Sequence, residues 1–462
     1  MTGASLDNEP FDVLVLGTGP IEALVASELA DQGRKVLHID RAPHYGGHHA
    51  TLSVTRLLEW AAGARDRRQV PRVELHAAGV EPLAPEAAEQ AFADLIRNDR
   101  SYAVELAPRL VRCRGKAIDA LVDAGVGDYM QFLGVDANYV MGRQQPLQRV
   151  PETKEDVFAA TWLSLIEKRK LMRLLTTLGD GSEVLPADDA MPFAEWLAER
   201  PFALSGTLLN AVVYAVARQG RKPLTARQGC EAVRRYVGSM GRYGRMAYLC
   251  AIHGGASEVA QSFCRLCAVA GGTYILDERP VVAPSANGQG FDVLLRNGSA
   301  HVRAVVMDST YAPDATQAED SATSVARALC IVDSAPLAND STALLSFVVA
   351  DGKTVSLLYM TSATKAVPNG QAIVYAWIEG SLADSKPFLM EALGSVVAAA
   401  GDGGVDSAPC KPLLTAYYEF CELVPPSTPG IVYTDGPASA DLDFDSLIDS
   451  AQKALSAIQL PG

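Results

Sequence analysis

The stretch that most constrains the fold is Phe11 to Gly47, close to the start of the chain. An apolar run of strand length is followed by a glycine turn, a helical segment and a second apolar run that ends at Asp40. Gly17 and Gly19 stand in the first turn. A β-α-β unit with glycines at its first turn and an acidic residue after its second strand is the layout of a dinucleotide-binding motif.

Position 22 departs from this motif, because Glu22 stands where the third glycine belongs. That glycine normally lets the helix pack closely on the strand, and the helix N-terminus beside it attracts the pyrophosphate of the cofactor. A carboxylate in the first turn can bind the free N–H groups itself and repels a phosphate. The sequence therefore predicts a Rossmann-like fold whose site, marked by Gly17, Gly19, Glu22 and Asp40, is degenerate and holds no FAD or NAD.

Charge and apolar runs argue against several classes of protein. The net charge is -14, so the chain has no cationic field to attract nucleic acid. The longest apolar run, Leu208 to Ala217, is too short to span a bilayer. Residues 1–10 are polar and acidic, unlike a signal peptide, and the eight cysteines are scattered through the chain. We therefore expect reduced thiols and a cytoplasmic protein.

No set of residues predicts catalysis or a metal centre. The sequence contains no GxSxG, HExxH or P-loop motif, and its seven histidines are scattered. Cys264 and Cys267 form a lone CxxC pair, for which two packed thiols are a commoner explanation than zinc. We therefore predict no catalytic residue, no metal ligand and a binding role rather than an enzyme.

Residues 101–236 are mostly helical by pattern, and the C-terminal third is rich in strands separated by turns such as Asn297-Gly298. The segment from Leu208 to Ala217 is apolar on nearly all sides and predicts a buried helix. An apolar stripe also runs along the helical part; its members are Phe158, Trp162, Leu165, Ile166 and Met172. Two explanations stay open: these helices pack on one another as a core, or they leave a groove for a lipid.

Another helical segment further along precedes a short strand. Glu258 and Arg265 are seven residues apart, so they project from the same side of this helix. Thr273 and Ile275 alternate and so share one face of the strand. On these residues alone, a solvated helix surface is the ordinary explanation for the two charges.

Four groups of segments together resemble the superfamily of Rab GDP-dissociation inhibitors and Rab escort proteins. The segments are Val13–Gly19 with Glu22; Val36–Arg41 with Tyr45–Gly47; Arg149–Pro151 with Glu167–Arg169; and Gly241–Gly244 with Phe263–Ala268 and Gly271–Tyr274. The first is shared in part with flavoproteins, whereas the order and spacing of all four are specific. The resemblance covers roughly residues 11–60 and 100–280 and is fainter in the C-terminal third.

The resemblance implies an α/β protein of two domains. Domain I, residues 1–112 and 229–462, would have a Rossmann-like FAD/NAD(P)-binding-type fold with a β-rich portion but no bound flavin. A smaller all-helical domain II, residues 113–228, would be inserted in the middle and hold the geranylgeranyl lipid of a Rab. Domain I would bind GDP-bound Rab GTPases on a platform. The residues that match this platform are Tyr45, Glu258, Arg265, Thr273 and Ile275.

Within the superfamily, the sequence resembles the escort proteins more than the inhibitors, although its length is closer to that of the inhibitors. The escort-like segments are Leu57–Trp60, Glu155–Phe158 with Ile166–Met172, Ser262–Cys267 and the ending from Ile431. An escort protein is a non-catalytic component that presents unprenylated Rab to the αβ heterodimer of Rab geranylgeranyltransferase and touches membranes only transiently. The alternatives are a Rab GDP-dissociation inhibitor that recycles prenylated Rab and, more remotely, a flavin-dependent oxidoreductase.

Overall fold

The structure is a computed structural model of the whole chain. It describes residues 6–63, 70, 73–77, 89–128, 130–143, 145–179, 190–199, 201–286, 288–312, 314–318, 324–337, 340–349, 352–398, 410–436 and 438–460. Among these residues, no helix combines the length and the apolar character needed to cross a membrane.

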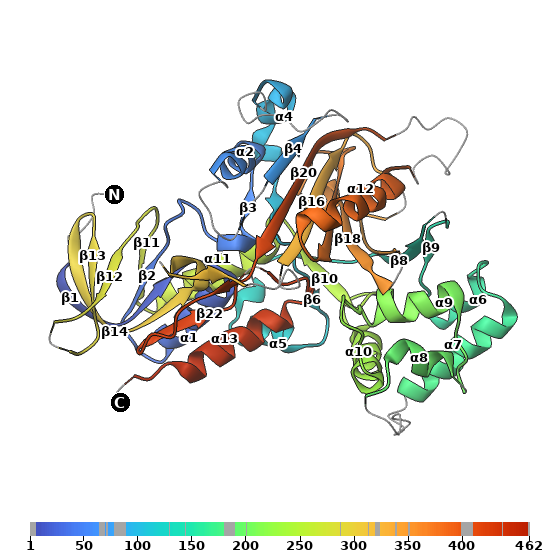
Figure 1. Cartoon of the computed structure of the whole chain (residues 1–462), viewed down its shortest axis with the longest axis horizontal. Coiled ribbons are helices and arrows are strands. Elements are labelled where there is room, and N and C mark those ends of the chain that lie inside the picture. The colour runs from blue at the N-terminus through green and yellow to red at the C-terminus, as the bar shows by residue number, and fades with distance from the viewer. Residues whose placement is uncertain are drawn as a thin grey trace.

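The first sheet contains the predicted β-α-β unit and runs through the part of the molecule nearest the N-terminus (Figure 1). Its strands are β1 (Leu6–Leu16), β2 (Val36–Ile39), β11 (Thr273–Ile275), β12 (Val281–Pro284), β13 (Phe291–Leu295), β14 (Gly298–Asp308) and β22 (Ile431–Thr434). The order is β11-β2-β1-β14-β13-β12, and β22 pairs with β14 beside this path. The central strands are parallel, whereas β12 and β13 form an antiparallel extension joined to β14 at the predicted Asn297-Gly298 turn.

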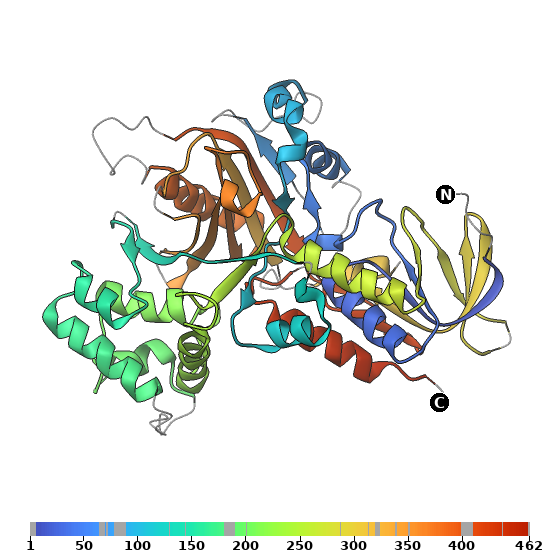
Figure 2. The ribbon, with the colours of Figure 1, turned by 180° about the vertical axis from the view of Figure 1, so that it is seen from behind.

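The two faces of β1 are both buried, which explains its continuous apolar sequence. Val13 and Val15 pack on one side against helices, while Leu14 and Leu16 pack on the other side with β13 and β14. The helices are α1 (Pro20–Asp31), α5 (Lys116–Asp123), α11 (Gly255–Val269) and α13 (Asp445–Ala457). Figure 2 shows α11, α1 and α13 lying alongside one another on this face. The last of these helices, α13, is amphipathic and buries Leu447 and Ile448.

The second sheet supplies the β-rich portion of the large domain (Figure 1). Its strands, in spatial order, are β4 (Val73–His76), β20 (Pro412–Cys421), β16 (Ser324–Val332), β19 (Ala372–Glu379), β18 (Thr354–Thr361), β17 (Thr342–Val348), β8 (Ala137–Gly142) and β9 (Gln148–Arg149). Neighbours are antiparallel except for β17 and β8. One face packs on α12 (Leu382–Ala398), and the other packs on a core that includes α2 (Val54–Ala62).

Short elements complete the large domain. They are α4 (Ala93–Arg97), the pair β3 (Thr51–Leu52) and β5 (Val104–Glu105), the three-stranded sheet of β6 (Val111–Arg112), β10 (Tyr248–Ala251) and β7 (Phe132–Gly134), and the pair β15 (Thr316–Gln317) and β21 (Leu423–Val424).

A group of helices stands apart at one corner of the molecule, and we call it the helical group (green in Figure 1). It consists of α6 (Lys154–Ala159), α7 (Leu165–Gly179), α8 (Phe193–Ala198), α9 (Gly206–Asn210), a π-helix (Ala211–Val216) and α10 (Ala226–Ser239). Its core contains Leu174, Phe193 and Phe202. A capping box of Thr153 and Asp156 begins α6. The predicted buried helix at 208–217 is confirmed, with a π turn in it.

One prediction about this region is wrong in part. Residues 101–149 are not mostly helical, because they carry strands β5 to β9 besides α5, and these strands pair with distant strands such as β17 and β10. The helical group itself runs from Lys154 to Ser239. The division into domains at residues 113–228 stays a prediction.

The apolar stripe also differs from its prediction as one helix face. The chain turns between α6 and α7, and Phe158, Leu165 and Ile166 lie exposed at this turn, with exposed fractions of 71%, 74% and 66%. The buried residues of α7 are instead Leu171, Leu174 and Leu178.

Candidate functional site

Glu22 fills the first turn of α1, in the degenerate dinucleotide site. Its side chain is buried, and its Oε1 accepts a hydrogen bond from the Thr434 hydroxyl on β22. A Cβ on Gly19 would meet Glu22 Oε2 at 2.5 Å, so this glycine leaves room for the carboxyl. Burial and, to a smaller extent, the nearby Asp308 raise the pKa of Glu22 to about 8. The carboxyl is therefore mostly neutral at pH 7 and occupies the space beside the helix N-terminus.

Asp40 is also satisfied within the chain. Its carboxylate accepts hydrogen bonds from Thr18 N (2.8 Å), Thr18 Oγ1 (2.6 Å), Ala42 N (2.8 Å) and the Tyr311 hydroxyl (2.9 Å). The Arg41 guanidinium lies over the Tyr311 ring at 4.3 Å and donates to the Thr310 carbonyl oxygen. In a dinucleotide site, this acidic residue would instead accept hydrogen bonds from a ribose.

A polar cavity of about 630 Å³ remains beside these residues, lined in part by Gly17, His48 and Asp308. His48 Nε2 lies 3.3 Å from Asp308, and although burial raises the pKa of Asp308, this histidine lowers it below its usual range. A flavin or nicotinamide dinucleotide does not fit the residues present. The acid that would hold the ribose has four donors already, and a carboxyl covers the helix N-terminus that would hold the pyrophosphate.

The predicted platform residues come from three neighbouring segments at one edge of the first sheet. Tyr45 follows β2, and its ring centroid lies 6.3 Å from that of Tyr274 on the edge strand β11. The Tyr274 hydroxyl donates to His38 Nδ1 at 2.9 Å, and His38 Nε2 donates to the carbonyl oxygen of Gly17. Burial lowers the pKa of His38 to about 4, so the imidazole is neutral in this relay. The edge is thereby tied to the glycine turn.

Glu258 and Arg265 lie on α11 as predicted, two turns apart. Arg265 is exposed, whereas Glu258 is half-buried and its Oε2 has no hydrogen-bond partner among the described residues. Burial raises the pKa of Glu258, and His253 opposes that rise. A half-buried carboxylate with an unpaired oxygen is suited to accept a hydrogen bond or a positive charge from a partner.

Thr273 and Ile275 lie on β11, beside Leu37 and Ile39 of β2. Ile275 packs against the core under the opposite face of the sheet from Tyr274, as strand alternation requires. The five predicted residues therefore lie on adjacent segments, but Thr273 and Ile275 do not share the face that carries Tyr45 and α11. Their role in binding stays a prediction.

The helical group holds an apolar cavity of about 60 Å³. Its lining includes Trp162, Leu174, Val212 of the π-helix, and Tyr236 and Met240 near the end of α10. Isolated π turns occur frequently at functional sites. One charged residue, Glu152, lines this otherwise apolar space.

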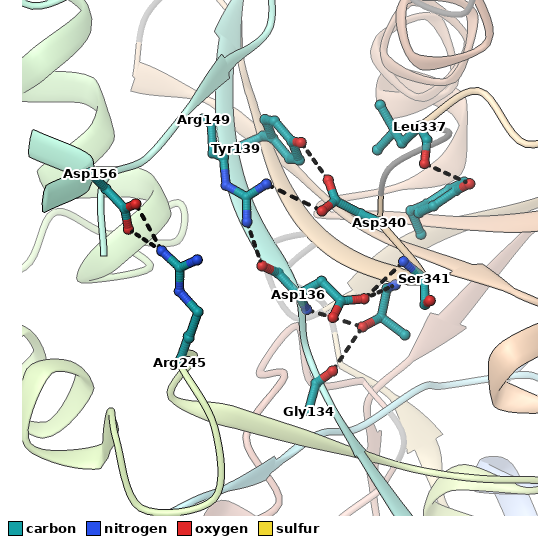
Figure 3. A network of polar contacts seen from close by, with 11 residues as sticks. Gly134, Asp136, Tyr139, Arg149, Asp156, Arg245, Leu337, Asp340 and Ser341 are labelled. Atoms are coloured by element: carbon teal, nitrogen blue, oxygen red, sulfur yellow. Dashed lines mark hydrogen bonds and ion pairs between the residues drawn. The ribbon is translucent and has the colours of Figure 1, made fainter. Parts of the chain in front are cut away.

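Two sets of polar contacts lie near this cavity, one within the second sheet and one between α6 of the helical group and the segment before β10 (Figure 3). Arg149 on β9 pairs with Asp340 at 3.2 Å and donates to the Asp136 carbonyl oxygen at 2.7 Å. Arg245, before β10, pairs with Asp156 of α6 at 2.7 Å. Each of the two arginines is therefore already paired with an acid.

Comparison with known proteins decides the family. The model of the family "GDI: GDP dissociation inhibitor" matches residues 6–72 and 86–356, which is more than half of the chain. This chain belongs to the GDP dissociation inhibitor family. The family predicted from the sequence is confirmed, and with it the prediction that the chain is a non-catalytic protein rather than an enzyme.

Relatives in the GDP dissociation inhibitor family carry two kinds of name. Rab proteins geranylgeranyltransferase component A of Drosophila melanogaster is 27% identical over 469 residues, covering 96% of this chain and 87% of the relative. Rab GDP-dissociation inhibitor of Saccharomyces cerevisiae is 28% identical over 342 residues, covering 72% of this chain and 70% of the relative. Identities so similar do not separate an escort protein from an inhibitor.

Solved structures confirm the fold class. The Rab GDI of Plasmodium falciparum matches with a TM-score of 0.72 at 17% identity, covering 99% of this chain and all of that one. An oxidoreductase from Methanosarcina mazei matches with a TM-score of 0.59 at 12% identity, covering 96% and 100%. The GDP dissociation inhibitor family therefore shares its Rossmann-like scaffold with oxidoreductases.

Sequence reasoning missed three features of this site. It did not find the hydrogen bond from Thr434 to Glu22 or the nearby charge of Asp308, because these residues end strands β22 and β14 far away in the chain. It did not single out Glu152, whose sequence neighbours gave no signal. It did find the apolar stripe, but its exposure at Phe158, Leu165 and Ile166 required the turn between α6 and α7.

Proposed function

We propose that this chain is a Rab escort protein. It binds GDP-bound Rab GTPases, presents them to the αβ heterodimer of Rab geranylgeranyltransferase, and keeps the prenylated Rab soluble in the cytoplasm until membrane delivery. Membrane contact is transient, and no nucleic acid takes part. Family membership supports the Rab-binding part of this proposal, and the Drosophila relative, whose name is component A of the transferase, matches almost the whole chain.

The edge of the first sheet is the proposed Rab-binding platform. Glu258 offers an unpaired, half-buried carboxylate, Arg265 offers an exposed cation, and Tyr45 offers an aromatic ring beside them. Opposite charges on one helix face favour a partner with a complementary pattern and fix its orientation.

The helical group is the proposed site of the geranylgeranyl lipid. Its cavity is apolar and is lined by a π-helix and by α7 and α10. Burial of an isoprenoid chain contributes about 0.8 kcal/mol per CH₂, enough to hold a lipid anchor in water. At about 60 Å³ the cavity is too small for a whole geranylgeranyl group, so lipid binding would require the lining helices to separate.

The observation that favours an escort protein is the exposed apolar patch of Phe158, Leu165 and Ile166 at the turn between α6 and α7. Large apolar side chains gathered on a surface mark interaction sites. The patch falls in the escort-like segments of the sequence, on the helical group and away from the platform (Figure 1). A Rab and its lipid account for the platform and the cavity, which leaves the patch for the transferase.

A Rab GDP-dissociation inhibitor is the second candidate, because the yeast inhibitor is as similar in sequence and the Plasmodium inhibitor shares the fold. Reconstituted prenylation separates the two. Purified αβ transferase, unmodified GDP-bound Rab and geranylgeranyl diphosphate would be incubated with and without the chain. We expect transfer only with the chain. Transfer that is equal without it would remove the escort role, whereas binding of prenylated Rab alone would favour the inhibitor.

The patch is tested in the same reaction. The double variant Phe158→Ala, Ile166→Ser should lower transfer by about tenfold or more, because interface anchors of this size contribute at least ~1.4 kcal/mol. Its affinity for GDP-bound Rab should stay unchanged. Val281→Ser is the matched control, since Val281 is 62% exposed on β12 of the first sheet. Equal transfer by the double variant and the control would place the transferase contact elsewhere.

A further inference from the structure

Glu152 is a buried carboxylate without a partner. Both of its oxygens are buried, and neither has a hydrogen bond among the described residues. It lines the apolar cavity of the helical group, next to Pro151 and Val150. An ionised group held this way is costly, because it has lost its contacts with water and gained none from the protein.

The charged and titratable groups that face Glu152 come from every element around it. They are Arg149 on β9, Arg245 before β10, Asp156 on α6, Asp340 before β17 and Tyr236 on α10. Arg149 is paired with Asp340 and Arg245 with Asp156 (Figure 3). Neither arginine donates a hydrogen bond to the Glu152 carboxylate. Burial raises the pKa of Glu152 to about 7, although the two arginines oppose the rise.

Glu152 gives an otherwise apolar cavity one polar part. Leu171, Leu174 and Val212 make the lining apolar, while Glu152 interacts electrostatically with the exposed Arg149 and Arg245. A hydrocarbon chain matches the apolar lining but offers no hydrogen-bond donor to Glu152. A peptide that carries such a chain matches both, because the backbone N–H groups beside the modified residue are donors.

We propose that Glu152 is the hydrogen-bond acceptor for the backbone N–H groups of the peptide segment that carries the lipid, so that the cavity selects a lipid-bearing peptide over a free lipid. This inference rests on the proposed function of the helical group. Under this proposal, Glu152 determines the specificity of the site for a peptide that carries the lipid.

The test measures binding of three probes to the full chain by fluorescence titration. The probes are a peptide with a geranylgeranyl thioether, the same peptide N-methylated at the modified cysteine and its neighbour, and geranylgeranyl methyl ether. We expect the wild type to bind the first peptide about tenfold more tightly than the N-methylated one, as one charge-assisted hydrogen bond requires. Glu152→Leu should remove this difference and retain the methyl ether.

The pH profile is a second readout. A proton on Glu152 competes with the peptide N–H groups, so affinity of the wild type for the first peptide should fall as the pH drops from 8 to 6. Glu152→Gln cannot ionise and should give a flat profile. Glu155→Gln is the matched control, because Glu155 is an exposed carboxylate three residues further along; it should behave as the wild type.

The outcomes distinguish the inference from the proposed function. A wild type that binds neither peptide would remove lipid binding, and the inference with it. A wild type that binds both peptides equally, with the same pH profile as Glu152→Gln, would overturn the inference and leave lipid binding intact. If Glu152→Leu fails to fold in a denaturation curve, the pH profile of Glu152→Gln decides.

Discussion

In the degenerate dinucleotide site, buried acids are satisfied by the chain itself, whereas in the cavity of the helical group a buried acid is not. Asp40 accepts four hydrogen bonds. Glu22 accepts a hydrogen bond from Thr434, and its carboxyl is largely neutral because its pKa is raised to about 8. The side-chain oxygens of Glu152 have no hydrogen-bond partner among the described residues. In the first site, residues of the chain itself satisfy the groups that a dinucleotide would need, whereas the second site keeps an unsatisfied acceptor. This difference in internal saturation is what the following predictions test.

The largest effect should come from opening the closed site. Asp40→Ala leaves the donors on Thr18, Ala42 and Tyr311 unpaired in a buried place, so we expect a loss of about 3 kcal/mol in the free energy of unfolding. Urea denaturation measures it. The control is Asp123→Ala, at an exposed aspartate near the end of α5, which should change stability by less than ~0.5 kcal/mol. Equal stability of the two variants would contradict the saturation of this site.

The protonation of Glu22 gives a second, pH-dependent effect. The pKa of this acid is raised from 4.5 to about 8 in the folded chain, so the folded state binds a proton that the unfolded state releases between these values. The contribution of Glu22 to stability therefore declines as pH rises from 5 to 8. Glu22→Gln needs no proton and should gain up to ~3 kcal/mol relative to the wild type across this interval.

Denaturation of the wild type and Glu22→Gln at pH 5.5 and 8 checks this margin. Other titrating groups cancel in the difference between the two proteins, because both retain them. If the difference in stability between the two proteins is the same at pH 5.5 and pH 8, Glu22 is ionised in the folded chain. The closed site would then contain a charged carboxylate rather than a neutral carboxyl.

Features that depend on residues close together in the sequence could be predicted, whereas features that depend on contacts between distant segments could not. The glycine turn, α1 and Glu22 lie within a few residues of one another, so the motif and its defect were readable. The groups that saturate the site were not, because Thr434 and Asp308 reach Glu22 only through the pairing of β22 and β14. The strands between residues 101 and 149 could not be predicted for the same reason, because they form by pairing with distant strands. The unpaired state of Glu152 is a property of the surrounding elements and leaves no mark in the sequence.

Substitutions in the proposed platform should mainly lower binding affinity, whereas substitutions in the closed dinucleotide site should mainly lower stability. Tyr45→Ala and Arg265→Ala should each weaken binding of GDP-bound Rab by about tenfold, or ~1.4 kcal/mol, since Arg265 is exposed on α11 and the half-buried Tyr45 ring lies beside Tyr274 at the same sheet edge. Arg265→Ala should leave the unfolding curve unchanged, whereas Tyr45→Ala should lower stability by about 1 kcal/mol because its ring packs partly against the core. Calorimetric titration with a GDP-loaded Rab measures the affinity. Unchanged affinity in both variants would move the binding face away from this edge.

The smallest effect on stability should come from Arg245, near the cavity of the helical group. Arg245 pairs with Asp156 at 2.7 Å, but its side chain is 61% exposed, and such pairs contribute only about 0.5 kcal/mol. Arg245→Ala should therefore leave the unfolding curve almost unchanged. It should still matter for the open site, because Arg245 opposes the rise in the pKa of Glu152 that burial causes. Without it, the pH at which the lipid-bearing peptide is half released should move upward. A profile that does not move would separate Arg245 from Glu152 and leave the incomplete site dependent on burial alone.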